Sequence, residues 1–186
     1  MNIAIIGYGK MGKEIEKTAL QRGHKIPLII DIHNQEDFTA ENLQKADTAI
    51  EFTTPETAAA NYRVCFDANI PVVSGTTGWI DKYNEIAEEC KKRSQCFLYA
   101  SNFSIGVNIF FQINQLLARL MNNFDDYNPE IGEIHHTQKK DAPSGTAITL
   151  ANQIIEQLDR KTKWTMDAPA VEEIPVKAVR ENNVPG

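Results

Sequence analysis

Residues 2–12 read NIAIIGYGKMG, an apolar run that leads directly into the glycine pattern GxGxxG at Gly7, Gly9 and Gly12. The apolar run predicts a buried β-strand, and the residues that follow Gly9 have the apolar spacing of a helix. Between a strand and a helix, such glycines allow a tight turn and let the backbone approach a pyrophosphate group. The stretch therefore predicts the first strand–turn–helix unit of a dinucleotide-binding fold.

The same order of strand and helix repeats through the first hundred residues. Continuous apolar runs predict strands at residues 2–6, 26–30, 48–52, 70–73 and 97–100, and helix-like segments lie at 10–22, 55–68 and 81–93. Strands that are apolar throughout are typical of a parallel sheet covered on both faces. The fold class predicted is α/β, with a doubly wound, Rossmann-type parallel sheet.

The pattern changes after residue 104. A long apolar helix is predicted for residues 105–121, an extended segment for 129–137 and a second helix for 143–158, and the remainder is extended. We therefore predict two domains, one over residues 1–104 and a second, α+β domain over residues 105–186.

Charge and cysteine content exclude several classes of protein. Lys and Arg number 19 against 25 Asp and Glu, and a net charge of −6 does not suit a protein that coats nucleic acid. Three cysteines without a CxxC pair argue against a disulfide framework or a zinc site. Neither a signal peptide nor an apolar run of the ~20 residues needed to span a membrane is present. We expect a cytoplasmic protein with no metal and no nucleic-acid or membrane partner.

Small and polar residues gather where the predicted strands end, at residues 7–9, 31, 53–55, 74–78 and 101–104. Ligands of open α/β sheets bind at the carboxyl ends of the strands, so these loops predict one long cleft. Asp31 lies 19 positions after Gly12, where an acid bonds the ribose hydroxyls of NAD. A solvated acid is the simpler reading of Asp31, and a plain turn is the simpler reading of each loop taken singly.

A second cluster lies at residues 135–146, which read HHTQKKDAPSGT. His and Lys are common general acids near neutral pH, and N–H groups at the start of a helix at residues 144–146 would seat a carboxylate. The alternative is a surface strand with basic residues that leads into a capped helix. On a regular strand His135 and His136 would point to opposite faces, so the pattern leaves open whether both belong to one site.

Five stretches carry a family resemblance: residues 5–12 (IIGYGKMG), 51–55 (EFTTP), 74–78 (SGTTG), 101–108 (SNFSIGVN) and 133–147 (EIHHTQKKDAPSGTA). With them the chain resembles the dihydrodipicolinate reductase family, the 4-hydroxy-tetrahydrodipicolinate reductases. The last stretch is the most specific, and the resemblance covers the whole chain in order. It implies hydride transfer from NADH or NADPH to a cyclic unsaturated dicarboxylate, giving tetrahydrodipicolinate in the diaminopimelate route to lysine.

The resemblance also implies residue roles. His135 matches the proton donor and acceptor of the family, Lys139 its proton donor, and His136, Gly145 and Thr146 its dicarboxylate-binding residues, with Ser144 beside them. The cofactor-binding positions that it implies are Gly7, Tyr8, Gly9, Lys10, Met11, Gly12, Asp31, Phe52, Thr53, Gly75, Thr76, Thr77, Ala100, Ser101, Asn102 and Phe103. Residues 1–104 become the dinucleotide-binding domain, and residues 105–186 become the substrate-binding and oligomerisation domain of a homotetramer.

Three departures from the family pattern qualify these expectations. Gln138 stands where many relatives have another histidine. Asp31 is followed by Ile32 and His33 rather than by an arginine, so a 2′-phosphate would meet an uncompensated carboxylate and NADH is favoured. Family members continue past the position of Gly186, so we expect a truncated sequence, and the oligomeric state and activity of this chain are left open.

Other functions remain open at this stage. The chain could be a nucleotide-binding but catalytically incomplete fragment of such an enzyme, or a dinucleotide sensor that binds without reacting. A homoserine or semialdehyde dehydrogenase is the nearest enzymatic rival, but it would not explain the run from His135 to Thr146. A sensor would not need a clamp for a dicarboxylate, so the intact run favours the reductase.

Overall fold

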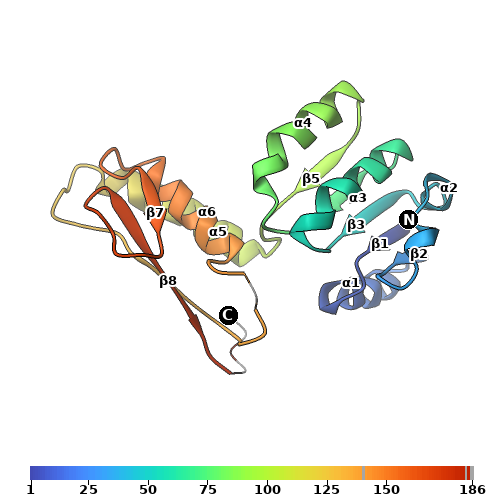
Figure 1. The fold of residues 1–186 in the computed structure, drawn as a ribbon, viewed down its shortest axis with the longest axis horizontal. Helices are drawn as coiled ribbons and strands as arrows, with labels where there is room; N and C mark the ends of the chain where they lie inside the picture. The colour runs from blue at the N-terminus through green and yellow to red at the C-terminus, as the bar shows by residue number, and fades with distance from the viewer. Residues whose placement is uncertain (140, 183, 185–186) are drawn as a thin grey trace. The chain divides into compact units, whose positions relative to one another are not determined.

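The computed structural model describes residues 1–139, 141–182 and 184. Lys140, in the second cluster, and the terminal residues 185–186 lie outside the described residues. The chain divides into two compact units, Met1–Ala100 and Ser101–Gly186, drawn from blue to green and from yellow to red in Figure 1. The division falls between residues 100 and 101, whereas the sequence placed it after residue 104.

The first unit is built on a five-stranded parallel sheet in the order β2-β1-β3-β4-β5. The strands are β1 Asn2–Ile6, β2 Lys25–Ile30, β3 Thr48–Glu51, β4 Val72–Ser74 and β5 Phe97–Tyr99. The chain moves from β1 outward to β2 and then crosses back to β3, which makes the point between β1 and β3 the topological switch of the sheet. The prediction of a doubly wound parallel sheet is confirmed.

The helices of the first unit follow the strands as the sequence predicts. They are α1 Lys10–Gln21, α2 Ala40–Leu43, α3 Pro55–Asp67 and α4 Tyr83–Lys92, with short 3-10 turns at Gln35–Asp37 and Ile80–Lys82. The sequence did not predict α2, because four residues are too few to show a helical period. It forms nonetheless because the Thr39 side chain accepts a hydrogen bond from the Asn42 N–H and caps the first turn.

The core of the first unit surrounds the aromatic residues of α3 and of the segment after β4. Tyr62, Phe66 and Trp79 are each almost fully buried. The Trp79 indole N–H also donates to the Thr76 carbonyl at 2.8 Å, so burial of this ring fixes the loop that follows β4. Trp79 is therefore a core residue that also positions a loop at the carboxyl edge of the sheet.

The second unit contains two long helices and a three-stranded parallel sheet in the order β6-β8-β7. Its elements are α5 Ile105–Met121, β6 Ile131–His135, α6 Gly145–Ile155, β7 Lys163–Thr165 and β8 Glu173–Arg180. Helices α5 and α6 lie side by side (Figure 1). The core lies between α6, the end of α5 and the sheet, around Ala151, Ile154 and Ile174.

Helix α5 has the bounds that the sequence predicts, whereas α6 is shorter than predicted. Ser144 is the N-cap of α6 rather than a helical residue, so the helix begins at Gly145. None of the described helices is long and apolar enough to cross a membrane.

Candidate functional site

A cavity of about 520 Å³ lies at the carboxyl ends of β1, β2 and β3, at the switch point of the sheet. Among the predicted cofactor positions, it brings together Gly7, Tyr8, Gly9, Asp31, Phe52 and Thr53. Residues that the sequence did not single out also line it, including Gln35, Thr57 and Asn61. The cavity therefore matches the predicted cleft only at the loops after β1, β2 and β3, and the predicted residues 74–78 and 101–104 are not among those that line it.

The glycine turn is packed so tightly that two of its positions exclude a side chain. Gly7 has a φ of +93°, and a Cβ there would lie 2.0 Å from the Phe52 carbonyl oxygen. A Cβ on Gly12 would lie 2.2 Å from the Gly7 carbonyl oxygen. Gly9 differs, because none of the described residues beyond its chain neighbours has an atom within 4 Å of its Cβ position. Since Gly9 lines the cavity and is the N-cap of α1, the turn leaves room for an anionic group at the start of this helix.

Lys10 and Met11 occupy the exposed first turn of α1, directly after this opening. Tyr8 is partly buried and donates its hydroxyl to the Glu16 carboxylate. That hydrogen bond raises the pKa of Tyr8, so its hydroxyl stays protonated at neutral pH.

Asp31 lies at the edge of the cavity in a loop held by its own hydrogen bonds. Its Oδ1 accepts the Ile32 N–H at 2.7 Å, and its N–H donates to the Asn34 side chain at 2.7 Å. The Gln35 side chain donates to the Asp31 carbonyl. Within the described part of the chain, Oδ2 of Asp31 accepts no hydrogen bond, so one oxygen is available at the cavity.

A buried carboxylate, which the sequence analysis gave no role, ties the cavity loops together. Glu51 ends β3 and is fully buried. Its oxygens accept from Thr53 Oγ1, from Ser74 Oγ at 2.6 Å, from Thr76 Oγ1 at 2.9 and 3.0 Å, and from the Asn61 amide at 3.4 Å. The loops after β3 and β4 are therefore joined through one side chain, and the Thr53 N–H donates to Thr76 Oγ1 as well.

The charge of Glu51 also acts on its neighbours. Burial first, and the nearby Glu51 carboxylate second, raise the pKa of Cys65 to about 12. The pKa of Tyr62 is also raised strongly; burial is the largest cause, and the charge of Glu51 is the second. Both groups therefore stay protonated at neutral pH, and neither Cys65 nor Tyr62 suits a role as a nucleophile or base.

The loop after β4 is closely packed against its neighbours. A Cβ on Gly75 would lie 2.1 Å from the Phe52 ring, so this position requires glycine. Thr76 is buried, and its hydroxyl is engaged by Glu51, while Thr77 is half-buried. We conclude that Thr76 supports the predicted cofactor site through its hydrogen bonds to Glu51 and Thr53.

The predicted cofactor positions at residues 100–103 span the end of one unit and the start of the other. The Ala100 N–H donates to the Ser74 carbonyl at 3.3 Å. The Ser101 hydroxyl lies 3.1 Å from that of Thr149, and the Asn102 amide donates to Thr146 Oγ1 at 3.4 Å. Ser101 and Asn102 thus contact the first turns of α6, and the Phe103 side chain is about half exposed.

In the second unit, the two histidines lie in different local structures. Strand β6 ends at His135, so His136 lies beyond the strand, and the alternation of a regular strand does not separate the two rings. His135 Nε2 lies 3.3 Å from Glu133 Oε2, on the same face of β6. His136 Nδ1 is buried and has no hydrogen-bond partner among the described residues. A buried ring nitrogen without a partner is a candidate for a ligand contact.

Lys139 is paired with Asp141, whose two oxygens both lie 2.8 Å from Lys139 Nζ. Burial alone would raise the pKa of Asp141, but the hydrogen bond and charge of Lys139, with Arg180 nearby, bring it below its ordinary value. Arg180 of β8 also donates to the carbonyls of Lys139 and Asp141. The loop that carries Lys139 is therefore held from β8, through a residue that the sequence analysis did not single out.

The start of α6 already has some of its N–H groups satisfied. Ser144 Oγ accepts the Ala147 N–H at 3.1 Å, and the Ser144 N–H donates to the Glu133 carboxylate at 3.0 Å. Ser144 is thus occupied within the protein. The N–H groups of Gly145 and Thr146 donate to no partner in the part of the chain that the structure describes, which leaves them as the open donors of this seat.

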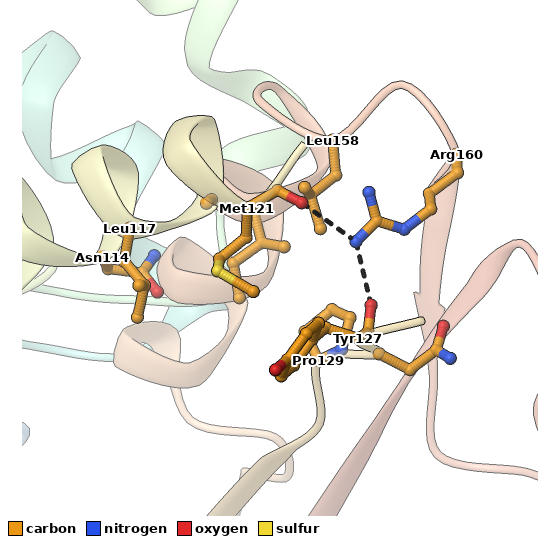
Figure 2. A pocket seen from close by; sticks show the side chains of 10 residues that line it. Asn114, Leu117, Met121, Tyr127, Pro129, Leu158 and Arg160 are labelled. Atoms are coloured by element: carbon orange, nitrogen blue, oxygen red, sulfur yellow. Dashed lines mark hydrogen bonds between the residues drawn. The ribbon is translucent and has the colours of Figure 1, made fainter. Parts of the chain in front are cut away.

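A second cavity, of about 240 Å³, lies in the second unit and contains none of the predicted site residues. Its lining is largely apolar and includes Leu117, Met121 and Leu158. Figure 2 shows the Arg160 guanidinium at its rim, donating to the carbonyls of Met121 and Tyr127 at 3.4 and 2.9 Å. Because the Met121 carbonyl ends α5 and Tyr127 lies in the loop that follows, Arg160 caps the end of this helix and joins it to the loop.

Comparison with known proteins shows that both units match the same protein family. The model of the N-terminal part of dihydrodipicolinate reductase matches residues 1–103, and that of the C-terminal part matches residues 106–186. The 4-hydroxy-tetrahydrodipicolinate reductase of Christiangramia forsetii is 50% identical over 190 residues, covering 100% of this chain and 77% of that protein. The enzyme of the same name from Archaeoglobus fulgidus is 32% identical and matches 100% of this chain and 80% of its own length.

Solved structures agree at the level of the fold. A dipicolinate-bound dihydrodipicolinate reductase from Paenisporosarcina sp. TG-14 superposes with a TM-score of 0.70 at 24% identity, covering 100% of this chain and 80% of that chain. Aspartate semialdehyde dehydrogenase II from Vibrio cholerae reaches a TM-score of 0.52 at 12% identity, covering 100% and 69%. The likeness to the dehydrogenase therefore concerns the shared architecture.

Proposed function

The chain belongs to the dihydrodipicolinate reductase family, and on that premise we propose that it reduces 4-hydroxy-tetrahydrodipicolinate to tetrahydrodipicolinate with a nicotinamide dinucleotide. The reaction is an NAD(P)H-dependent oxidoreduction and belongs to lysine and diaminopimelate biosynthesis. One observation carries the assignment to these residues: the Glu133 carboxylate contacts both His135 and the Ser144 N–H. This shared contact supports the proposal that the predicted proton donor and the predicted carboxylate seat belong to one site.

The first unit fits the dinucleotide. A bound NADH or NADPH would supply the hydride for the reduction. The open position at Gly9 would take the pyrophosphate, and the available oxygen of Asp31 would accept from a ribose hydroxyl. Phe52, Thr53 and the loop that contains Gly75 would border the rest of the molecule. We propose NADH as the preferred cofactor, because Asp31 would repel a 2′-phosphate.

The second unit supplies binding and a proton. The N–H groups of Gly145 and Thr146 and the buried Nδ1 of His136 would hold the two carboxylates of the substrate. Loss of the 4-hydroxyl group as water gives the unsaturated ring, and reduction of that ring takes up one hydride and one proton. His135 or Lys139 would give the proton, and Asp141 keeps the Lys139 side chain in place until substrate arrives.

The test is NADH oxidation with the substrate made in place by the preceding synthase from pyruvate and aspartate semialdehyde. A loss of NADH absorbance that depends on the synthase would support the proposal, and a reaction without synthase is the control. NADH binding without oxidation would contradict it and leave a nucleotide-binding, catalytically incomplete chain.

We also propose that the enzyme acts in the cytoplasm as a homotetramer. Sedimentation velocity would test the oligomeric state.

A further inference from the structure

Glu133 has an unusual position for a carboxylate. It lies in the middle of β6, and its side chain is only 9% exposed. Three polar groups surround it: Ser144 N–H at 3.0 and 3.2 Å from its two oxygens, His135 Nε2 at 3.3 Å and Arg180 Nη1 at 3.7 Å. If Glu133 had only a structural role, there would be no need for its partners to include His135, the proposed proton donor.

The contact with His135 determines which ring nitrogen can react. A protonated imidazole donates from both nitrogens, so Nε2 donates to Glu133 and Nδ1 carries the proton that can leave. After transfer to the substrate, the neutral ring keeps its proton on Nε2 and its hydrogen bond to Glu133. The carboxylate therefore favours the tautomer that the next proton uptake at Nδ1 requires.

The contact with Arg180 extends the effect of Glu133 to the loop of Lys139. Arg180 Nη1 faces Glu133, while its Nε and Nη2 donate to the carbonyls of Lys139 and Asp141. The cation also balances the negative charge of Glu133 near a seat for a dianionic substrate. One carboxylate thus contacts His135, the start of α6 and the arginine that holds the Lys139 loop.

We propose that Glu133 is a positioning residue for the reduction: it holds His135 with Nδ1 free to exchange a proton and fixes the start of α6 so that Gly145 and Thr146 face the substrate. This inference deepens the proposed function and rests on it. Because Glu133 lies two residues before His135 on the same strand, its contribution is orientation rather than direct contact with the reacting atoms.

The variant Glu133→Gln tests the proposal, because glutamine has the same shape and can still accept the Ser144 N–H. We expect kcat to fall about ten- to a hundredfold, since a well-placed general acid contributes about 10²–10⁴, while the Kd for NADH stays within about twofold. The matched control is Glu130→Gln, at an exposed glutamate 3.5 Å from Lys177, which should keep wild-type kcat. An unchanged kcat in Glu133→Gln overturns the proposal, as does a loss of NADH affinity as large as the loss of kcat.

A second measurement does not depend on activity. The chain has four histidines, so ring ¹⁵N signals can be assigned by comparison with a His135→Asn variant. In the neutral wild-type protein His135 should carry its proton on Nε2, and Glu133→Gln should shift the population toward Nδ1–H. An unchanged tautomer overturns the proposal even if kcat falls. Failure of the wild-type enzyme to oxidise NADH would instead refute the proposed function, and the ¹⁵N spectra would still report on the contact.

Discussion

The glycine turn allows a prediction that separates packing from cofactor binding, with Gly12→Ala and Gly9→Ser as a pair. A Cβ at residue 12 would lie 2.2 Å from the Gly7 carbonyl oxygen, whereas ordinary contact begins at 3.4 Å. The carbonyl must therefore retreat by roughly 1 Å, which disturbs a backbone that is itself packed on Phe52. A Cβ at residue 9 would meet no atom of the described residues beyond its chain neighbours within 4 Å and would enter the space proposed for the pyrophosphate.

The magnitudes differ for the two variants. Overpacking costs about 1–3 kcal/mol, and a Cβ that would lie 2.2 Å from a backbone atom belongs at the upper end of this range, about 2–3 kcal/mol. Replacement of glycine by alanine within α1 returns about 1 kcal/mol. Gly12→Ala should therefore lose about 1–2 kcal/mol of unfolding free energy, which corresponds to a lower Tm by about 4–16 °C for a unit of this size. Serine is a good N-cap, so Gly9→Ser should change the unfolding free energy by less than about 0.5 kcal/mol.

The assays are thermal unfolding followed by circular dichroism and NADH titration by calorimetry. Both variants should weaken NADH binding by about tenfold or more, because each obstructs or displaces the turn that would face the pyrophosphate. Only Gly12→Ala should lose stability. Wild-type NADH affinity in Gly9→Ser would refute the placement of the pyrophosphate, and a Gly12→Ala variant as stable as wild type would refute the close packing of the turn.

Three further predictions concern single side chains. Lys139→Ala should lower kcat by about 10²–10³ with NADH affinity unchanged, as steady-state kinetics and titration would show, and full turnover would remove Lys139 from the mechanism. The ratio of kcat/KM for NADH to that for NADPH should be about ten or more and should fall in Asp31→Asn, whereas equal efficiency in the wild type would contradict the role of Asp31. Asp141 has a lowered pKa in the folded protein, so the stability it contributes is complete above its ordinary pKa of 3.8 and is lost as the pH falls through the lower folded value. Urea unfolding of Asp141→Asn should thus differ from wild type at neutral pH and converge with it in acid; a difference that persists in acid would contradict the ion pair with Lys139.

The elements that the sequence predicted well are those with a clear hydrophobic pattern. The strands of the first unit are short continuous apolar runs, the helix from Ile105 to Met121 is a longer and largely apolar segment, and the structure contains them within one or two residues. The end of β6 was harder to predict, because nothing in the run EIHHTQ marks where its pairing with β8 stops. Strand alternation therefore could not decide whether His135 and His136 share a site, since only His135 belongs to the strand.

The chemistry of the loops could be recognised in advance because glycines, histidines and hydroxyls stand out after apolar strands. Arg180 could not be found in this way. It lies on a strand 39 positions after Asp141, and only the parallel pairing of β6 with β8 brings it to the Lys139 loop. Such a residue becomes visible only when the register of two distant strands is known.

Glu51 and Glu133 show what the two units have in common. Each is an acid within a predicted strand, and each accepts hydrogen bonds from residues outside that strand: Thr53, Ser74 and Thr76 for Glu51, and Ser144 for Glu133. A buried carboxylate is costly unless several donors satisfy it, so it fixes the loops that bring those donors. An acid in an otherwise apolar strand is therefore a sequence signal for the residue that positions a site, whereas glycine, histidine and lysine in the next loop indicate where the ligand binds.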